Sequence, residues 1–187
     1  MELRSSFLVS AAVKSLVDVV LPAIDPANAL AQEQGKLAVG TLQFAASRMS
    51  LQFRYDAVDL SQLVELAGTI RDVLRSEANA DEAASALDTV TRRSESVLSR
   101  ALVDPAALED AGAELRGAIT SAMSAARASK SAPAQRSIAK AVVKHAGEQL
   151  ARERAWVAPQ GWEGDVSIPA IDTLLGQSEI APTSASS

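Results

Sequence analysis

The sequence has no cysteine and a single histidine, His145, among its 187 residues. Without cysteine the chain has no disulfide framework, no thiolate nucleophile and no cysteine-ligated zinc or iron–sulfur centre. A ferritin-like di-iron site is excluded too, because it needs two Glu-x-x-His motifs. We therefore expect neither a metal nor a cofactor.

Long apolar runs are also missing. The longest stretch without a charge runs from Leu37 to Ser47, which is shorter than the roughly 18 residues of a spanning helix. The apolar run from Phe7 to Val13 follows the offsetting charges of Glu2 and Arg4, whereas a secretory signal starts with net positive charge. We expect no transmembrane segment, no export signal and a cytoplasmic location.

Alanine is abundant: the chain contains 37 alanines, and hydrophobic residues make up 48% of it. Apolar residues recur at steps of three and four, which is the spacing of helices with one buried face. The pattern predicts helices over about 3–21, 26–54, from Asp59 to a polar break at 79–81, from there to about 102, and over 105–129 and 132–156. This predicts an all-α fold, an antiparallel bundle of five to six helices over residues 1–156.

Cap chemistry supports these boundaries. Asp25 with Pro26 and Asp104 with Pro105 are typical of an N-cap followed by the first helical position. Asp59 with Gln62 resembles a capping box. Residues 49–56 are expected to be helical with Met49 and Phe53 facing the core, although their alternation also fits an extended edge.

An irregular C-terminal tail is expected over 157–187, because proline and glycine recur there and helical periodicity stops, with a short turn at 171–175. Trp156 and Trp162 lie at its start. Tryptophan is enriched at the energetic centres of interfaces, so both are candidates for partner binding. The alternative is that they pack on the chain's own bundle and fix the tail in cis.

A basic cluster lies in the stretch from Leu115 to Gly147, which has no acidic residue. Its candidate partner-binding residues are Arg127, Lys130, Arg136, Lys140 and Lys144. They form a docking surface for a partner, or a solvated face paired with the acidic tail. Nucleic acid is a disfavoured partner, because the chain is acidic overall and no aromatic residues are interleaved with the cluster.

Three polar residues are candidates for a ligand pocket: Arg54, Tyr55 and His145. His145 is one turn from Glu148, so it fits a general base as well as an ordinary surface histidine. No nucleophile elbow, phosphate-binding glycine loop or dinucleotide fingerprint occurs in the sequence. This absence favours a role that is not catalytic.

These observations together predict a non-catalytic helical-bundle subunit that assembles with itself or with another protein. One alternative is a protein that binds a small molecule, or an enzyme, that uses a cavity between helices. A second alternative is an amphipathic coat protein on a lipid or polymer surface.

Overall fold

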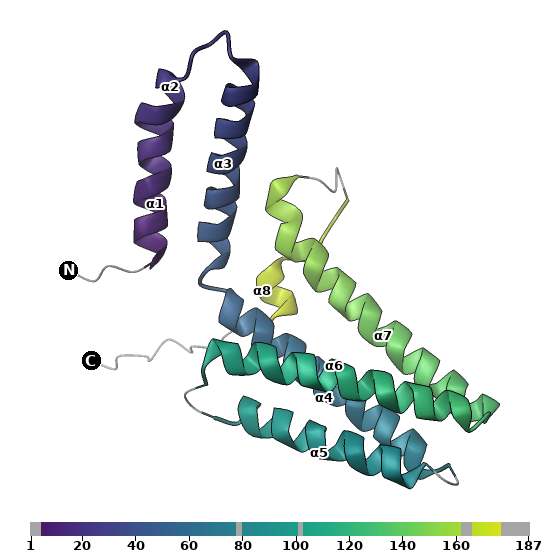
Figure 1. Cartoon of the computed structure of the whole chain (residues 1–187). Helices are drawn as coiled ribbons and strands as arrows, with labels where there is room; N and C mark the ends of the chain where they lie inside the picture. Colours follow the sequence, from purple (N-terminus) through teal and green to yellow (C-terminus); the bar gives the residue numbers. More distant parts are fainter. Residues whose placement is uncertain (1–4, 78–79, 101–102, 162–165, 177–187) are drawn as a thin grey trace, which may run out of the picture. The chain divides into compact units, whose positions relative to one another are not determined.

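In the computed structural model, the described residues are 5–77, 80–100, 103–161 and 166–176, and they form helices and connections without a β-strand (Figure 1). The elements are α1 (Ser5–Ser15), the π-helical η1 (Leu16–Val20), α2 (Leu21–Ala23), α3 (Ala29–Arg48), α4 (Gln52–Arg75), α5 (Asp81–Leu98), α6 (Pro105–Ala128), α7 (Ala132–Val157), the 3-10 turn η2 (Ala158–Gln160) and α8 (Ile171–Leu174). The predicted all-α fold is confirmed.

The chain divides into two compact units. Unit 1 comprises residues 1–52 and 159–162, and unit 2 comprises residues 53–158 and 163–187. Unit 1 is built on a helical hairpin and unit 2 on a helical bundle.

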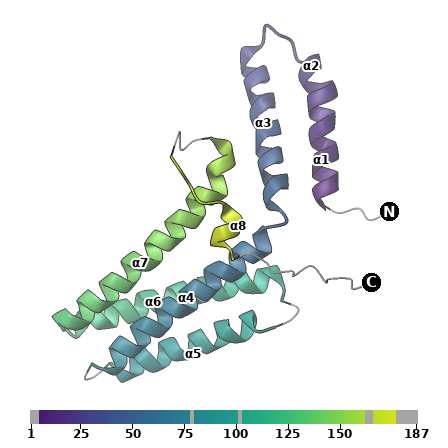
Figure 2. The same cartoon turned by 180° about the vertical axis from the view of Figure 1, so that it is seen from behind.

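Unit 1 is built on a helical hairpin, in which the arm formed by α1, η1 and α2 runs antiparallel to α3 (Figures 1 and 2). The arm passes Pro22, which lies at the first positions of α2 where no backbone donor is required, and ends at Ala23. The N-cap of α3 is Asn28, whose side chain accepts a 3.1 Å hydrogen bond from the backbone of Ala31. The prediction that Asp25 is the N-cap is wrong, because its carboxylate accepts a hydrogen bond from the backbone N–H of Ala27 within the turn before α3.

The hairpin buries very little. Among its described residues only Val39 is buried. At Gly35 the two helices approach closely, since a Cβ there would lie 2.5 Å from Cδ2 of Leu21. Large apolar side chains elsewhere on this unit are exposed, namely Phe7, Leu8, Val17, Val19, Val20, Leu30, Leu37 and Met49.

By length and composition, the stretch Ser5–Ala23 is a helix able to cross a membrane, with 19 residues and a mean hydropathy of 1.6. Core helices and signal sequences share these properties. The expectation of no transmembrane segment rested on the lack of a long stretch without charges. Lys14 and Asp18 interrupt Ser5–Ala23, and the structure joins these two side chains in an ion pair one turn apart. The pair reduces the cost of both charges in apolar surroundings.

Unit 2 holds the hydrophobic core, which is formed by α4, α5, α6 and the first part of α7. The most deeply buried large apolar residues are leucine and isoleucine, among them Leu60, Ile70, Leu74, Leu87 and Leu115. Helices α5 and α6 lie side by side (Figure 2) and make the most extensive helix contact among the described residues. Small buried residues such as Ala84, Ala111 and Ala122 allow this close approach.

Two local predictions in this region are wrong. Asp59 and Gln62 do not form a capping box, because α4 begins at Gln52 and both residues lie inside it. The segment after Met49 is helical from Gln52 onward, but Met49 and Phe53 are 40% and 47% exposed and do not reach the core.

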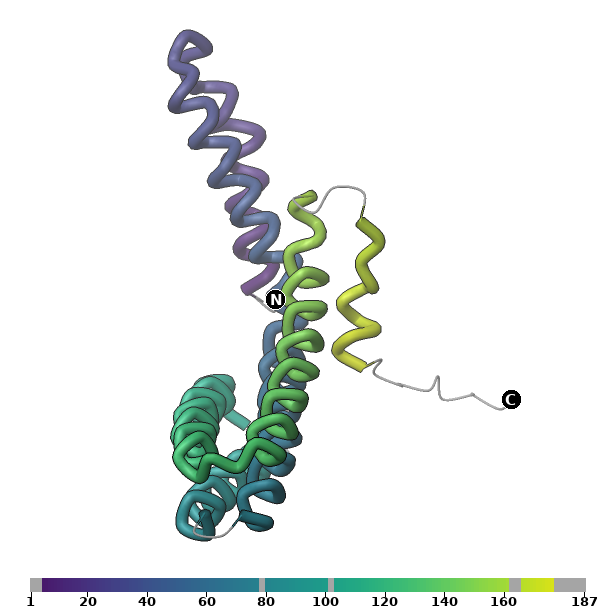
Figure 3. The backbone as a smooth tube through the Cα atoms, turned by 90° about the vertical axis from the view of Figure 1, so that its right-hand side faces the viewer, coloured from purple at the N-terminus to yellow at the C-terminus, as the bar shows by residue number. Residues whose placement is uncertain are grey.

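Part of the predicted tail is folded. Helix α8 lies beside α7 (Figure 3), and its Ile171 and the following Leu175 are buried. The guanidinium of Arg54 holds this helix, donating to the carbonyl of Asp172 at 3.0 Å and to that of Leu175 at 3.2 Å. It also donates to the carbonyl of Gly176 and lies 3.4 Å from the Asp172 carboxylate.

Candidate functional site

Among the described residues, the most buried charge is that of Arg152 on α7, whose side chain is 1% exposed. It donates to Oδ1 of Asp59 on α4 at 2.8 Å and to the side-chain oxygen of Gln62 one turn later. Arg116 of α6 contacts the second carboxylate oxygen of Asp59. This cluster joins three helices, and the Nε atom of Arg152 has no hydrogen-bond partner among the described residues.

Tyr55 and Trp156 pack beside this cluster. Their ring centroids are 4.7 Å apart with the planes tilted by 58°, and the guanidinium of Arg152 lies 6.0 Å from the centre of the Tyr55 ring. Burial raises the pKa of Tyr55, although the charge of Arg152 opposes the shift. Tyr55 is therefore a neutral aromatic partner of two side chains of unit 2, the half-buried Trp156 and the buried Arg152.

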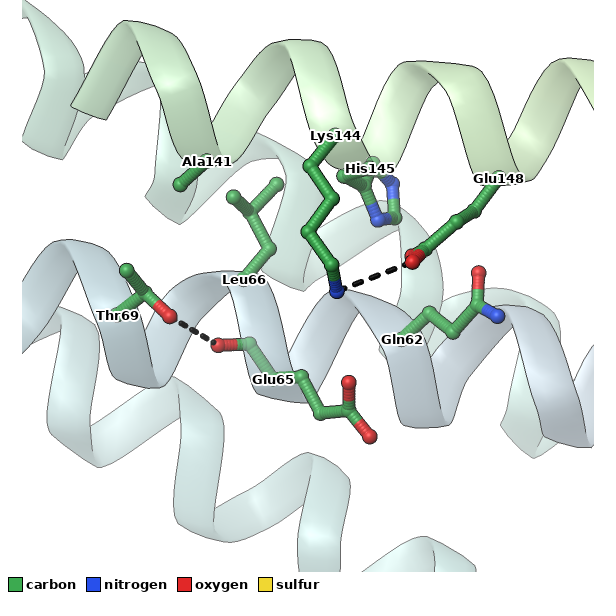
Figure 4. A pocket seen from close by; sticks show the side chains of 8 residues that line it. All are labelled: Gln62, Glu65, Leu66, Thr69, Ala141, Lys144, His145 and Glu148. Carbon is green, nitrogen blue, oxygen red and sulfur yellow. Dashed lines mark hydrogen bonds and ion pairs between the residues drawn. The ribbon is translucent and has the colours of Figure 1, made fainter. Parts of the chain in front are cut away.

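His145 lines a small pocket between α4 and α7 (Figure 4). The other side chains drawn around it include Gln62 and Glu65 from α4 and Lys144 and Glu148 from α7. Lys144 forms a 3.0 Å ion pair with Glu148. Burial lowers the pKa of His145 below its ordinary value of 6.5, while the carboxylate of Asp59 acts in the opposite direction.

The three predicted pocket residues do not share one cavity. His145 lines the pocket of about 80 Å³, Tyr55 packs on Trp156, and Arg54 binds α8. Ligand pockets have volumes of roughly 300 to 1,000 Å³, so the His145 pocket is too small for an organic substrate. Among the described residues, no three histidine or carboxylate side chains are grouped to hold a metal ion.

The predicted basic cluster divides into two sets. Arg116 and Lys144 pair with Asp59 and Glu148. Within the described parts of the chain, the structure records no ion pair for the second set, which is Arg127, Lys130, Arg136 and Lys140. The acidic residue of the tail that is described, Asp172, pairs with Arg54 instead.

The two tryptophans predicted to bind a partner have different outcomes. Trp156 contacts Tyr55 within unit 2, as the packing alternative expects, and it remains half-buried. Trp162 lies outside the described residues. Partner binding by either residue stays a prediction.

The sequence alone did not predict that Asp59, Gln62, Arg116 and Arg152 form a cluster. One signal was present: Arg152 follows Ile138 and His145 at successive steps of seven, so it falls on the stripe of α7 that faces the bundle. A charged residue in such a position needs a buried partner. The identity of that partner, 93 residues earlier, is not encoded in local spacing.

Comparison with known proteins gives no match: no family model, no curated protein and no solved structure is significantly similar to the chain.

Proposed function

We propose that this protein is a non-catalytic subunit that associates with a second copy of itself through its N-terminal hairpin. The observation that supports the proposal is the exposure of large apolar side chains on the hairpin. Val19, Leu30 and Leu37 are 64%, 68% and 63% exposed, while Val39 is the one buried residue among those described in unit 1. Two helices that bury so little are not stable through their own contacts and need a covering surface.

The polar side chains of the hairpin lie on one of its two flat sides. The seam between the helices follows the half-buried Val13 and Leu16 on one arm and Gly35 and Val39 on the other. A polar stripe lies about a quarter turn beyond the seam on each arm. Viewed from one end of the hairpin, successive residues turn clockwise around one helix and anticlockwise around the other, because the helices are antiparallel. Since the two seams face each other, a quarter turn beyond each seam leads to the same side of the hairpin. The stripes consist of Ser10, Lys14 and Asp18 on the first arm and Gln32, Lys36 and Gln43 on α3.

The opposite side of the hairpin is largely apolar. By the same spacing it carries Leu8, Ala12 and Val19 on the first arm and Leu30, Ala38 and Ala45 on α3. By that spacing five of the eight exposed large apolar residues of unit 1 belong to this side, namely Leu8, Val19, Leu30, Leu37 and Met49, and they offer on the order of 400 Å² of surface at roughly 80 Å² per side chain. A stable interface takes about 800 Å² from each partner, so these side chains supply about half of one side of a dimer.

A second copy is the partner that fits this surface best. Two amphipathic hairpins that face each other form a four-helix bundle with a shared apolar core, and two-fold pairing is the commonest symmetry of homo-oligomers. The polar side carries Lys14 and Lys36 against Asp18 and Glu33, so it has no excess of either charge. A helix bound to an anionic membrane would carry a basic polar face.

A membrane-crossing arrangement fits the hairpin less well. Helix α3 packs along the arm at the contact between Gly35 and Leu21, so it would enter the bilayer together with Ser5–Ala23. It would carry Glu33 and Lys36 with it, and each charge in the hydrocarbon region costs several kcal/mol.

The native mass of the purified full-length chain, measured by light scattering over a range of concentrations, tests the proposal. We expect a dimer, and we expect the double variant Leu30→Gln with Leu37→Gln to be a monomer of unchanged helicity. The matched control is Val143→Gln with Leu150→Gln, which removes two equally exposed residues from α7 and should stay dimeric.

Other outcomes contradict the proposal in distinguishable ways. A wild-type monomer at every concentration excludes self-association. A dimer lost in the α7 control but kept in the hairpin variant moves the interface to α7. Sedimentation of the chain with neutral lipid vesicles, reversed by mild detergent, supports the coat-protein alternative instead.

A further inference from the structure

Unit 2 contains an apolar groove between the end of α6 and the first half of α7. Its volume is about 290 Å³, at the lower limit of small-molecule sites. The deepest lining residues, Ala126 and Ile138, are 2% and 4% exposed, and Val142 packs against the same core. Val143, at 71% exposure, forms an open edge. The groove therefore presents a buried apolar floor that is accessible from solvent.

The polar lining of this groove is cationic. Arg127, from the last turn of α6, contributes its side chain, and Gln135 of α7 donates a hydrogen bond to the Arg127 carbonyl. Arg136 is on the same face of α7 as Val143, two helical turns before it. No acidic residue occurs from Leu115 to Gly147, so neither wall of the groove carries a carboxylate.

The cations at the groove keep their charge available. Among the described residues, Arg127, Lys130, Arg136 and Lys140 have no recorded ion pair. Glu77, which follows α4, reaches the connection between α6 and α7, where its carboxylate accepts a 2.9 Å hydrogen bond from Ser131. An unpaired guanidinium beside an apolar hollow is complementary to a ligand with an anionic head and an apolar chain.

We propose that the groove between α6 and α7 binds a single-chain fatty carboxylate of medium length, with the chain over Ala126 and Ile138 and the carboxylate on Arg127. The small volume leaves no room for a two-chain lipid. The single guanidinium in the lining matches one carboxylate, which it binds through two parallel hydrogen bonds. This proposal does not depend on dimerisation, because its residues all lie in unit 2.

Titration calorimetry of the full-length protein tests the proposal with three probes: decanoate below its critical micelle concentration, decanol below its solubility limit, and acetate. We expect one decanoate per chain, weaker binding of decanol and none of acetate. Arg127→Gln should weaken decanoate binding about tenfold, to the level of decanol, because a charged hydrogen bond is lost. The matched control, Arg100→Gln, removes an exposed arginine that lies outside the groove and should leave binding unchanged.

A second variant tests the position of the chain and the head group without disturbing the core. Val143→Glu places a carboxylate at the exposed edge, so it should weaken decanoate far more than decanol. The proposal is overturned if wild-type protein does not bind decanoate, or if Val143→Glu weakens both probes equally. Equal weakening by Arg127→Gln and Arg100→Gln would also overturn it, because the attraction would then be a general effect of net charge.

Discussion

Arg152 and Asp59 are 93 residues apart in the chain and share a 2.8 Å hydrogen bond in the interior of unit 2. The guanidinium is 1% exposed and the carboxylate 14%, so each charge is stabilised mainly by the other and by their neighbours. The contact joins the first third of α4 to the last third of α7. It therefore sets which faces of these two helices meet, whereas the surrounding leucines set how tightly they pack.

The first prediction concerns this pair. Asp59→Ala leaves the Arg152 charge buried without its carboxylate and should lower the free energy of unfolding by about 3–5 kcal/mol. The double variant Asp59→Ala with Arg152→Met replaces both charges and should recover a large part of that loss. Urea unfolding followed by circular dichroism measures both.

Arg116→Gln is the control, because this arginine contacts the same carboxylate from a half-exposed position and should cost about 1 kcal/mol or less. If the double variant is as unstable as Asp59→Ala, the cluster is needed for more than mutual neutralisation of its charges.

Most of the secondary structure follows from the sequence, and most of the tertiary polar contacts do not. The start of α6 at Pro105 was predictable because Asp104 caps the helix locally, accepting from Ala106. The start of α4 was not, because Asp59 has the same local chemistry as a cap but is occupied by Arg152 and Arg116. Side chains of Asp and Gln satisfy either role, and only distant residues decide between them.

The candidate site shows the same division. Tyr55, His145 and Trp156 were identified as unusual, since each is rare in this chain. Their neighbours come from other helices, so spacing along one helix did not show that Arg54 binds α8 while Tyr55 faces Trp156. The exposed hairpin was also missed, because its apolar periodicity is the same as that of a buried helix.

The second prediction compares two glycines of α3. Gly40→Ala meets nothing within 4 Å and should stabilise the hairpin by about 0.5–1 kcal/mol, the usual difference in helix propensity. Gly35→Ala gains the same propensity, but its Cβ would lie 2.5 Å from Leu21 and 3.2 Å from Ile24. Leu21 must then leave its rotamer, so no net stabilisation is expected.

Amide hydrogen exchange of α3 measures this difference, because it reports the local opening of the hairpin and not the stability of unit 2. Equal protection in the two variants would mean that the arm and α3 do not approach closely at Gly35.

The third prediction concerns His145, the one histidine of the chain. Its pKa should lie below 6.5 in the folded protein, since burial disfavours the imidazolium. Its single set of ring proton signals makes an NMR titration unambiguous. The unfolded chain then binds more protons than the folded one, so the contribution of His145 to stability is full above pH 6.5 and decreases as the pH falls through the folded-state pKa.

His145→Gln should remove this part of the pH dependence and leave the stability at pH 8 nearly unchanged. A measured pKa at or above 6.5 would contradict the burial of the ring in the pocket between α4 and α7.

The fourth prediction concerns the attachment of α8. Arg54 donates to the carbonyls of Asp172, Leu175 and Gly176, the last turn and end of that helix, where a cation also complements the helix dipole. Arg54→Ala should therefore lower amide protection at Leu174 and Leu175 by a factor of ten or more, because hydrogen bonds from a charged donor contribute about 1.5–3 kcal/mol. Asp172→Ala should have a smaller effect, since its carboxylate is 63% exposed and forms the longest of these contacts.

Arg92→Ala serves as the control for loss of an arginine, because that side chain binds Asp88 on α5 and does not contact α8. Unchanged protection in Arg54→Ala would show that burial of Ile171 and Leu175 alone holds the helix, and the guanidinium would then be free to serve a ligand.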